Sequence, residues 1–336
     1  MSMSGTGATI FGCDGLTLSA SERDFFRDAD PMGFIVFGRN VDNPAQLSRL
    51  TADMRAAVGR DAPVLVDQEG GRVQRLRSPH WREFIPPLDQ VLGAGDLAAA
   101  ARAMALRSRI IAAELRAVGI DANCAPVADI ASDLTHPFLK NRCYGTDPHT
   151  VSAIARAVAD AHLAGGVLPV VKHMPGHGRS RNDTHLDLPT VTTDRDTLIA
   201  TDFAPFAALR DLPMAMTAHI IFAAYDADNP ATQSRVMIDV IRHQIGFQGL
   251  LMTDDLNMQA LSGSLADRTA RSMAAGCDIA LHCKGDMAQM VEVAAAAGTM
   301  TPATLARVQA ALALRHTPES VDLAGLEADL AALMPA

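Results

Sequence analysis

The chain has 336 residues, of which 49% are hydrophobic, so it is long enough for one large α/β barrel and can bury a sizeable core. Its net charge is −9 and no basic stripe is visible, which argues against nucleic acid as a partner. No apolar run reaches the roughly 18 residues of a membrane helix, and the N-terminus lacks the pattern of a signal peptide, so no membrane partner is expected.

Short apolar runs recur along the chain, each followed by a polar turn and then by a helical pattern. They are rich in Val, Ile, Leu, Met or Ala, which is typical of strands buried on both faces of a parallel sheet. Eight such units favour a closed (β/α)8 barrel of the TIM type over an open doubly wound sheet, and no GxGxxG follows the first strand. The predicted strands are Ala8–Phe11, Gly33–Phe37, Pro63–Val66, Asp121–Cys124, Leu168–Val171, Met214–Thr217, Leu250–Thr253 and Asp278–His282.

Helical periodicity fills the stretches between these runs, and the tail Met287–Ala336 is predicted to add C-terminal helices, with Thr301-Pro302 as a helix start. No linker or repeat is visible, so one domain over residues 1–336 is the simplest expectation. The five cysteines are scattered without a CxxC pair, which suggests reduced thiols in a cytoplasmic protein. The predicted helices are Pro44–Val58, Leu97–Val118, Thr150–Ala164, Asp196–Ala208, Arg235–Ile245 and Leu265–Ala275.

The segments after four of the strands are unusually polar. They are residues 67–75 (DQEGGRVQR), 172–178 (KHMPGHG), 218–219 (AH) and 254–258 (DDLNM). Catalytic groups of a parallel barrel come from the C-terminal ends of its strands, so these segments are expected to converge on one mouth.

Asp254 directly follows an apolar strand, so its carboxylate is expected to project into this mouth. A glycosidase needs a carboxylate there, either to attack the anomeric carbon or to stabilise an oxocarbenium-like transition state. The alternative is that Asp254 or Asp255 caps the following helix, with Asp255 as the better cap.

The segment Lys172–Pro189 is predicted to be an exposed loop that can move, because it is rich in glycine and proline and almost free of apolar residues. Within it, Asp183 and His185 are two residues apart. In an extended segment both side chains lie on one side, so the carboxylate can orient the imidazole for proton transfer. The alternative is a histidine in a solvated ion pair.

A zinc site is the rival interpretation of His173 and His177, which are four residues apart. Pro175-Gly176 interrupts any helix between them and no glutamate adjoins the first histidine, so we expect no metal.

Several charged residues follow or lie near strand ends, where they suit sugar hydroxyls and an acetamide carbonyl. The alternative for any one arginine is a surface ion pair. The chain has one tryptophan, Trp81, which argues against an aromatic platform for long polysaccharides and favours a short exo-type pocket. The charged residues are Asp67, Arg75, Arg142, Lys172 and His173.

These segments resemble motifs of the family 3 glycoside hydrolases, specifically the compact bacterial β-N-acetylhexosaminidases of cell-wall recycling. Residues 67–75 resemble Asp-x-Glu-Gly-Gly-x-Val-x-Arg, and residues 172–178 resemble Lys-His-Phe-Pro-Gly-His-Gly with Met174 in place of phenylalanine. Residues 183–185 resemble the Asp-Ser-His dyad of this branch, and residues 253–258 resemble the nucleophile motif. A weaker likeness joins residues 141–145 to an Arg-Ser-Phe-Gly segment, from which Cys143 and Tyr144 depart. The resemblance runs from about Gly33 to Leu281.

The resemblance implies a retaining exo-β-N-acetylglucosaminidase with Asp254 as nucleophile, His185 as acid/base and Asp183 as its partner. It implies that the GlcNAc ring is bound by the five charged residues named above. The implied substrate is GlcNAc β-1,4-linked to 1,6-anhydro-N-acetylmuramic acid, with or without peptide. Larger members of the family place their acid/base on a second domain, for which this chain has no room. No cofactor or metal is implied.

Two other functions stay open at this point. One is a phosphorylase of the same branch, in which phosphate replaces water. The other is a non-catalytic sugar-binding barrel, which would need neither Asp254 nor the pair formed by Asp183 and His185.

Overall fold

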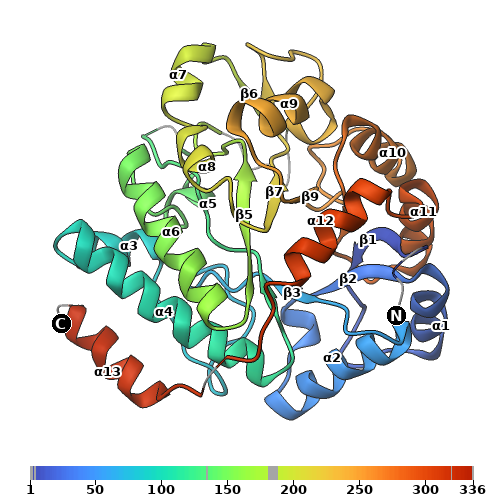
Figure 1. Ribbon diagram of the computed structural model, residues 1–336, viewed down its shortest axis with the longest axis horizontal. Coiled ribbons are helices and arrows are strands. Elements are labelled where there is room, and N and C mark those ends of the chain that lie inside the picture. The colour runs from blue at the N-terminus through green and yellow to red at the C-terminus, as the bar shows by residue number, and fades with distance from the viewer. Residues whose placement is uncertain (1–2, 4, 134, 181–187, 319, 335–336) are drawn as a thin grey trace.

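The computed structural model of the protein describes residues 3, 5–133, 135–180, 188–318 and 320–334. At its centre eight parallel strands pair in one sheet, and helices surround them (Figure 1). The strands are β1 (Gly7–Phe11), β2 (Pro31–Val36), β3 (Val64–Val66), β4 (Ala122–Asn123), β5 (Leu168–Met174), β7 (Met214–Thr217), β9 (Leu250–Met252) and β10 (Ala280–His282).

The sheet closes on itself. Its strand order is β10-β1-β2-β3-β4-β5-β7-β9, and a parallel bridge between Met252 of β9 and Ile279, just before β10, joins the two ends. The predicted (β/α)8 barrel is therefore confirmed, and the open doubly wound sheet is wrong.

All eight predicted strands are present, with ends that differ from the prediction by at most three residues. The largest difference is in β5, which continues through Lys172, His173 and Met174 instead of ending at Val171. The prediction ended this strand before Lys172 because a charged residue is not expected in a buried strand. In the structure the strand continues, because carboxylates inside the protein neutralise the charge of Lys172.

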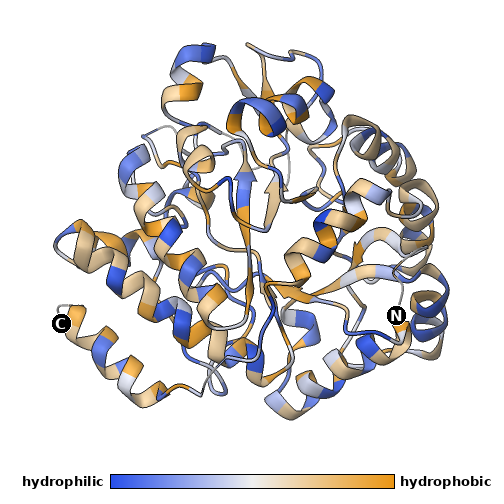
Figure 2. Cartoon of the chain, viewed as in Figure 1, coloured by the Kyte–Doolittle hydropathy of each residue, from blue (hydrophilic) through white to orange (hydrophobic). Residues whose placement is uncertain are grey.

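Alternate strand residues face the barrel interior and the surrounding helices, which explains why the runs are apolar throughout. On β1, Ile10 packs in the interior cluster, whereas Phe11 packs in a cluster with residues of the surrounding helices. Figure 2 shows the strands mostly in the orange of hydrophobic residues, whereas the outer helices carry both orange and blue. The interior layer at the C-terminal end includes Ile35, Met216 and Leu281.

The predicted helices are present, with two changes. The stretch predicted as one helix over 235–245 continues from an α-helix into a π-helix, η3 (Val240–Ile245). Helix α1, which begins with a capping box between Ser19 and Glu22, was not predicted, and neither were the short α3 and α5. The helices are α1 (Ala20–Ala29), α2 (Pro44–Val58), α3 (Pro87–Gly93), α4 (Leu97–Ala117), α5 (Pro137–Lys140), α6 (Pro148–Ala164), α7 (Arg195–Ala200), α8 (Ala204–Ala208), α9 (Arg235–Asp239), α10 (Leu265–Ala275), α11 (Met287–Ala297), α12 (Pro302–Leu312) and α13 (Leu323–Leu333).

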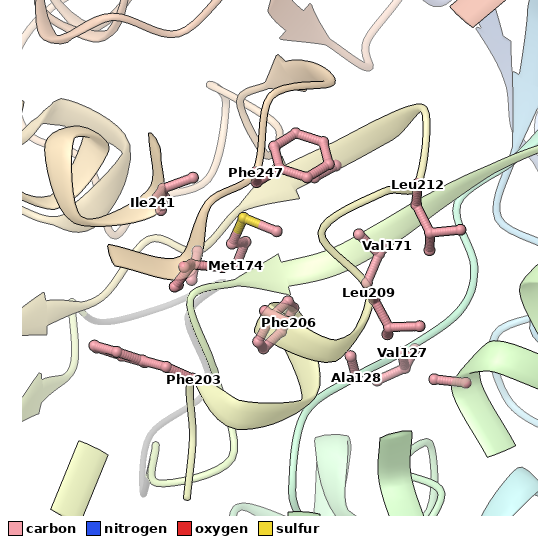
Figure 3. Packing of buried hydrophobic residues seen from close by; sticks show 14 of the residues in the cluster. Val127, Ala128, Val171, Met174, Phe203, Phe206, Leu209, Leu212, Ile241 and Phe247 are labelled. Carbon is pink, nitrogen blue, oxygen red and sulfur yellow. The ribbon is translucent and has the colours of Figure 1, made fainter. Parts of the chain in front are cut away.

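The second change is that the helix predicted over 196–208 is broken into α7 and α8. Pro205 lies in the first turn of α8, where it lacks an N–H and would clash with a preceding helical turn. The break lets Phe203 and Phe206 turn inward, and Figure 3 shows Phe206 in one apolar cluster with Val171 and Met174 of β5.

The tail forms the predicted C-terminal helices, and α12 begins at Thr301-Pro302 as expected, with Thr301 as its N-cap. Helix α13 packs along α4 on the outside of the barrel (Figure 1). Among the described residues, no helix combines the length and the apolar character that crossing a bilayer requires.

Candidate active site

A pocket lies at the C-terminal end of the barrel, above the interior layer formed by Ile35, Met216 and Leu281. It brings together six of the eight residues predicted for the site. The other two, Asp183 and His185, lie outside the described residues. The six in the pocket lining are Asp67, Arg75, Arg142, Lys172, His173 and Asp254.

A buried chain of ion pairs forms one wall of the pocket. Lys172 Nζ lies 2.8 Å from Asp67 Oδ1 and 2.6 Å from Glu69 Oε1. Arg142 binds Glu69 through two nitrogens at 2.9 and 2.8 Å, and Arg75 donates to Asp67 at 3.0 Å. The bidentate geometry fixes both position and orientation, as surface pairs of flexible side chains do not. Arg142 is held in this bidentate way, and Arg75, which makes one bond to Asp67, lines the same pocket.

Burial opposes ionisation of both acids in this chain, but the neighbouring cations outweigh it. Arg142 and Lys172 lower the pKa of Glu69 to about 2, and Lys172 and Arg75 hold the pKa of Asp67 well below its usual range. Lys172 is 2% exposed, and burial would lower its pKa, yet Asp67 and Glu69 raise it. The wall is therefore fully charged at neutral pH.

A tight turn after β3 places Asp67 and Arg75 side by side. The N–H groups of Glu69 and Gly70 both donate to the Val73 carbonyl, and Gly70 has a φ of +92°. A side chain at Gly70 would collide with the buried guanidinium of Arg107, which itself donates to the Glu69 carbonyl at 2.6 Å. Gly70 is thus required by the close approach of Arg107, and Gly71 by that of the Pro86 backbone.

His173 is held by an acidic residue that the sequence did not reveal. Its Nδ1 lies 2.7 Å from Asp129 Oδ2, and the other oxygen of Asp129 accepts from the His177 N–H at 2.7 Å. Burial and the adjacent His173 lower the pKa of His177 to about 4. Within the described residues, no group of three or more His, Cys, Asp or Glu side chains is placed to hold a metal ion.

Asp254 follows β9 and lines the same pocket as the ion-pair wall. Its Oδ1 accepts from the Asp255 N–H at 2.8 Å. Burial opposes ionisation, but the imidazoles of His219 and His173 and the Asp255 N–H together hold the pKa of Asp254 below its usual range. A carboxylate that is ionised and faces a pocket can act as a nucleophile.

Neither aspartate caps the next helix, so that alternative is wrong. Helix α10 begins ten residues later, with Ser264 as its N-cap and a capping box to Asp267. Asp255 instead accepts hydrogen bonds from the Asn257 N–H in the same loop and from the Cys283 N–H after β10.

The first part of the predicted loop is packed, contrary to expectation. Residues 172–178 are buried, and Gly178 lies directly against the Ile130 backbone, where a side chain would not fit. The N–H of His136 donates to the Ser180 carbonyl, and at the other end the N–H of Ile221 donates to the Pro189 carbonyl. Hydrogen bonds therefore fix the chain on both sides of the segment that carries Asp183 and His185.

Three residues of the site were not assigned a role from the sequence: Glu69, Asp129 and His219. Glu69 lies inside the motif of residues 67–75, and His219 follows the predicted strand Met214–Thr217, so the position of each in the sequence was a signal that it belongs to the site. Asp129 is 44 residues from His173, and no local pattern marked it.

Comparisons with known proteins agree on one family. Residues 16–313 match the family described as Glycosyl hydrolase family 3 N terminal domain. A Beta-hexosaminidase of Xanthomonas campestris pv. campestris (strain B100) is 34% identical over 302 residues, which cover 88% of this chain and 90% of that protein. The solved structure of a glycoside hydrolase family 3 beta-N-acetylglucosaminidase from Paenibacillus sp. str. FPU-7 has a TM-score of 0.87 at 26% identity, covering 97% of this chain and 67% of that one. NagZ from Neisseria gonorrhoeae, solved in complex with N-trifluoroacetyl-D-glucosamine, has a TM-score of 0.80 at 29% identity, covering 98% of each chain.

Proposed function

Because the chain belongs to family 3 of the glycoside hydrolases, we propose that it is a retaining exo-β-N-acetylglucosaminidase with Asp254 as its nucleophile. One observation carries this proposal. The ionised carboxylate of Asp254 shares a pocket with the charged wall formed by Asp67, Lys172 and Arg142. A nucleophile facing fixed hydrogen-bond partners is what cleavage of a sugar requires.

In the proposed complex, the GlcNAc ring lies between Asp254 and this wall. Asp67 accepts hydrogen bonds from ring hydroxyls, and Lys172, Arg75, Arg142 and His173 donate to hydroxyls or to the acetamide carbonyl. The wall is held by its own ion pairs before the sugar arrives, so little side-chain entropy is lost on binding. The single tryptophan, Trp81, is buried in the core and provides no platform for a longer glycan.

The proposed reaction has two displacements. Asp254 attacks the anomeric carbon, the bond to the leaving-group oxygen breaks, and His185 gives that oxygen its proton while Asp183 orients the ring. His185 then takes a proton from water, the water oxygen bonds to the anomeric carbon, and Asp254 leaves as a carboxylate. Two inversions give net retention. The assignments of His185 and Asp183 rest on their motif, since both lie outside the described residues.

For the substrate we propose GlcNAc β-1,4-linked to 1,6-anhydro-N-acetylmuramic acid, with or without peptide, cleaved in the cytoplasm during cell-wall recycling. The motif resemblance supports this substrate. The likeness to NagZ, whose complex holds an N-acylated glucosamine, supports the sugar. All five cysteines are free, which suits a reducing compartment.

Product analysis with an aryl β-GlcNAc glycoside and with the GlcNAc–anhydromuramoyl disaccharide tests the proposal. We expect free GlcNAc of β configuration at first, at a rate independent of added phosphate. GlcNAc-1-phosphate that appears only with phosphate would instead establish the phosphorylase. If the folded protein turned over neither substrate, the result would favour the non-catalytic sugar-binding barrel.

A further inference from the structure

The orientation of the Asp254 carboxylate depends on the backbone of the next residue. Within the described residues, that carboxylate accepts one hydrogen bond, from the Asp255 N–H to Oδ1. Its other oxygen, Oδ2, has no such partner there and is the atom available to attack. Any movement of the Asp255 backbone would therefore turn the attacking oxygen.

Asp255 is held by its side chain from the β10 side. Its Oδ1 accepts from the Cys283 N–H at 3.2 Å, and Cys283 directly follows β10. The same oxygen accepts from the backbone and side-chain nitrogens of Asn257 at 3.1 and 3.3 Å. One side of the loop is thus fixed to a neighbouring strand.

Asp255 is held by its carbonyl from the β7 side. His219, two residues after β7, is 1% exposed, and its Nε2 lies 3.1 Å from the Asp255 oxygen. Its Nδ1 lies 2.8 Å from Thr232 Oγ1. Since β9 lies between β7 and β10 in the barrel, the loop after β9 is held by hydrogen bonds from residues that follow both neighbouring strands.

The hydrogen-bond partners fix which nitrogen of His219 carries the proton. A carbonyl can only accept, so Nε2 must donate to Asp255. Burial lowers the pKa of His219, so the ring is neutral near pH 7 and Nδ1 is an acceptor. The single hydrogen of the Thr232 hydroxyl faces two acceptors, Nδ1 at 2.8 Å and the Ala218 carbonyl at 3.0 Å. The Thr217 hydroxyl, 2.8 Å from Thr232 Oγ1, can then donate to it in turn.

We infer that His219, backed by Thr232, is a positioning residue that fixes the Asp255 backbone so that the Asp255 N–H aims the Asp254 carboxylate at the anomeric carbon. This inference rests on the proposed function. It assigns His219 to the glycosylation step and not to sugar binding, because the ion-pair wall comes from other strands, β3 and β5.

Comparing His219→Leu with His219→Gln distinguishes the effect of losing the N–H donor from the effect of losing the volume of the ring. Glutamine can place an N–H close to the position of Nε2, whereas leucine cannot. The rate of the first chemical step is measured as the pre-steady-state burst of aryl alcohol from an aryl β-GlcNAc glycoside, together with KM. We expect His219→Leu to slow the burst about 100-fold with KM changed less than about threefold, and His219→Gln to stay within about fivefold of the wild type.

Thr232→Val keeps the inference testable if His219→Leu does not fold. Removal of the hydroxyl takes away the polar group that Nδ1 contacts and loosens the orientation of the ring, so we expect the burst to slow about tenfold. The matched control is Thr269→Val in α10, a buried threonine whose hydroxyl donates to the Leu265 carbonyl, 2.7 Å away, and which does not line the pocket. Its burst is expected to equal that of the wild type.

Three results would overturn the inference: equal losses in His219→Gln and His219→Leu, a loss that appears in KM and not in the burst, or equal bursts for Thr232→Val and Thr269→Val. Failure of the proposed function looks different, because then the wild-type protein itself releases no GlcNAc.

Discussion

Glu69 is the buried acid that joins Lys172 to Arg142, so replacing it by glutamine tests the charged wall directly. Glutamine keeps the size and one acceptor oxygen but leaves two buried cations with one carboxylate fewer. Breaking a buried pair on one side is costly because the partner charge stays behind in a desolvated place. We expect Glu69→Gln to lower both stability and turnover.

The size of the effect follows from the carboxyl group. Burial opposes its ionisation, but Arg142 and Lys172 bring its pKa from the ordinary 4.5 to about 2. That difference corresponds to about 3 kcal/mol of folding stability. For a chain of this length we expect Tm to fall by about 6 °C.

The pH dependence has a definite sign. Because the folded-state pKa lies below the unfolded value, the contribution of Glu69 is complete above about pH 4.5 and is lost as the pH falls toward about 2. The difference in the free energy of unfolding between wild type and variant, measured by thermal or urea unfolding, should therefore decrease from about 3 kcal/mol at pH 7 to about 2 kcal/mol at pH 3.5.

The matched control is Glu83→Gln, which removes the same charge from an exposed ion pair with Arg77. Surface pairs contribute about 0–1 kcal/mol, so its Tm is expected to stay within about 2 °C of the wild type. The reasoning is refuted if Glu69→Gln melts as the wild type does, or if its deficit grows as the pH is lowered.

Asp254→Asn should lower turnover at least ~10³-fold with an unchanged Tm, and a fluorinated glycoside trap should label Asp254 in the wild type by mass spectrometry; near-normal turnover would remove Asp254 from the mechanism. His185→Ala and Asp183→Ala should slow substrates with poor leaving groups far more than activated aryl glycosides, and the double variant should lose no more than the worse single one; additive losses would mean that the two do not act together. Burial raises the pKa of Glu114 to about 7, so its ionised form costs stability above its unfolded value of 4.5. Glu114→Gln should therefore unfold at higher urea than the wild type at pH 8, and this advantage should vanish below about pH 4.5; an advantage that persists there would contradict the burial argument.

The elements that the sequence predicts well are those whose signals are local. Helix α2 was predicted to the residue, because Asn43 caps it, Pro44 begins it and Gly59 ends it in the left-handed conformation. The strands were found because both faces are buried and the runs are apolar throughout. The break between α7 and α8 also had a local signal, Pro205, which helical periodicity concealed.

Two features of the site that were missed depend on partners far along the chain. Strand β5 continues through Lys172 only because Asp67, 105 residues away, neutralises the ammonium group. The buried turn after β5 depends on Asp129, which binds both His173 and His177. Residue types at strand ends thus predicted which groups meet in the pocket, but not which buried acids hold them in place.

The charges around the pocket also bear on how the proposed reaction ends. Three cations, Lys172, Arg75 and Arg142, lie near four carboxylates, those of Asp67, Glu69, Asp254 and Asp255. When Asp254 becomes an ester in the glycosyl-enzyme, its negative charge disappears while the charges of the wall stay. The charge of Lys172 favours the ionised form of Asp254, so a group that is proposed to bind the sugar also favours departure of the carboxylate in the second displacement. A wall of fixed ion pairs therefore serves both steps, because its charge does not change while that of Asp254 does.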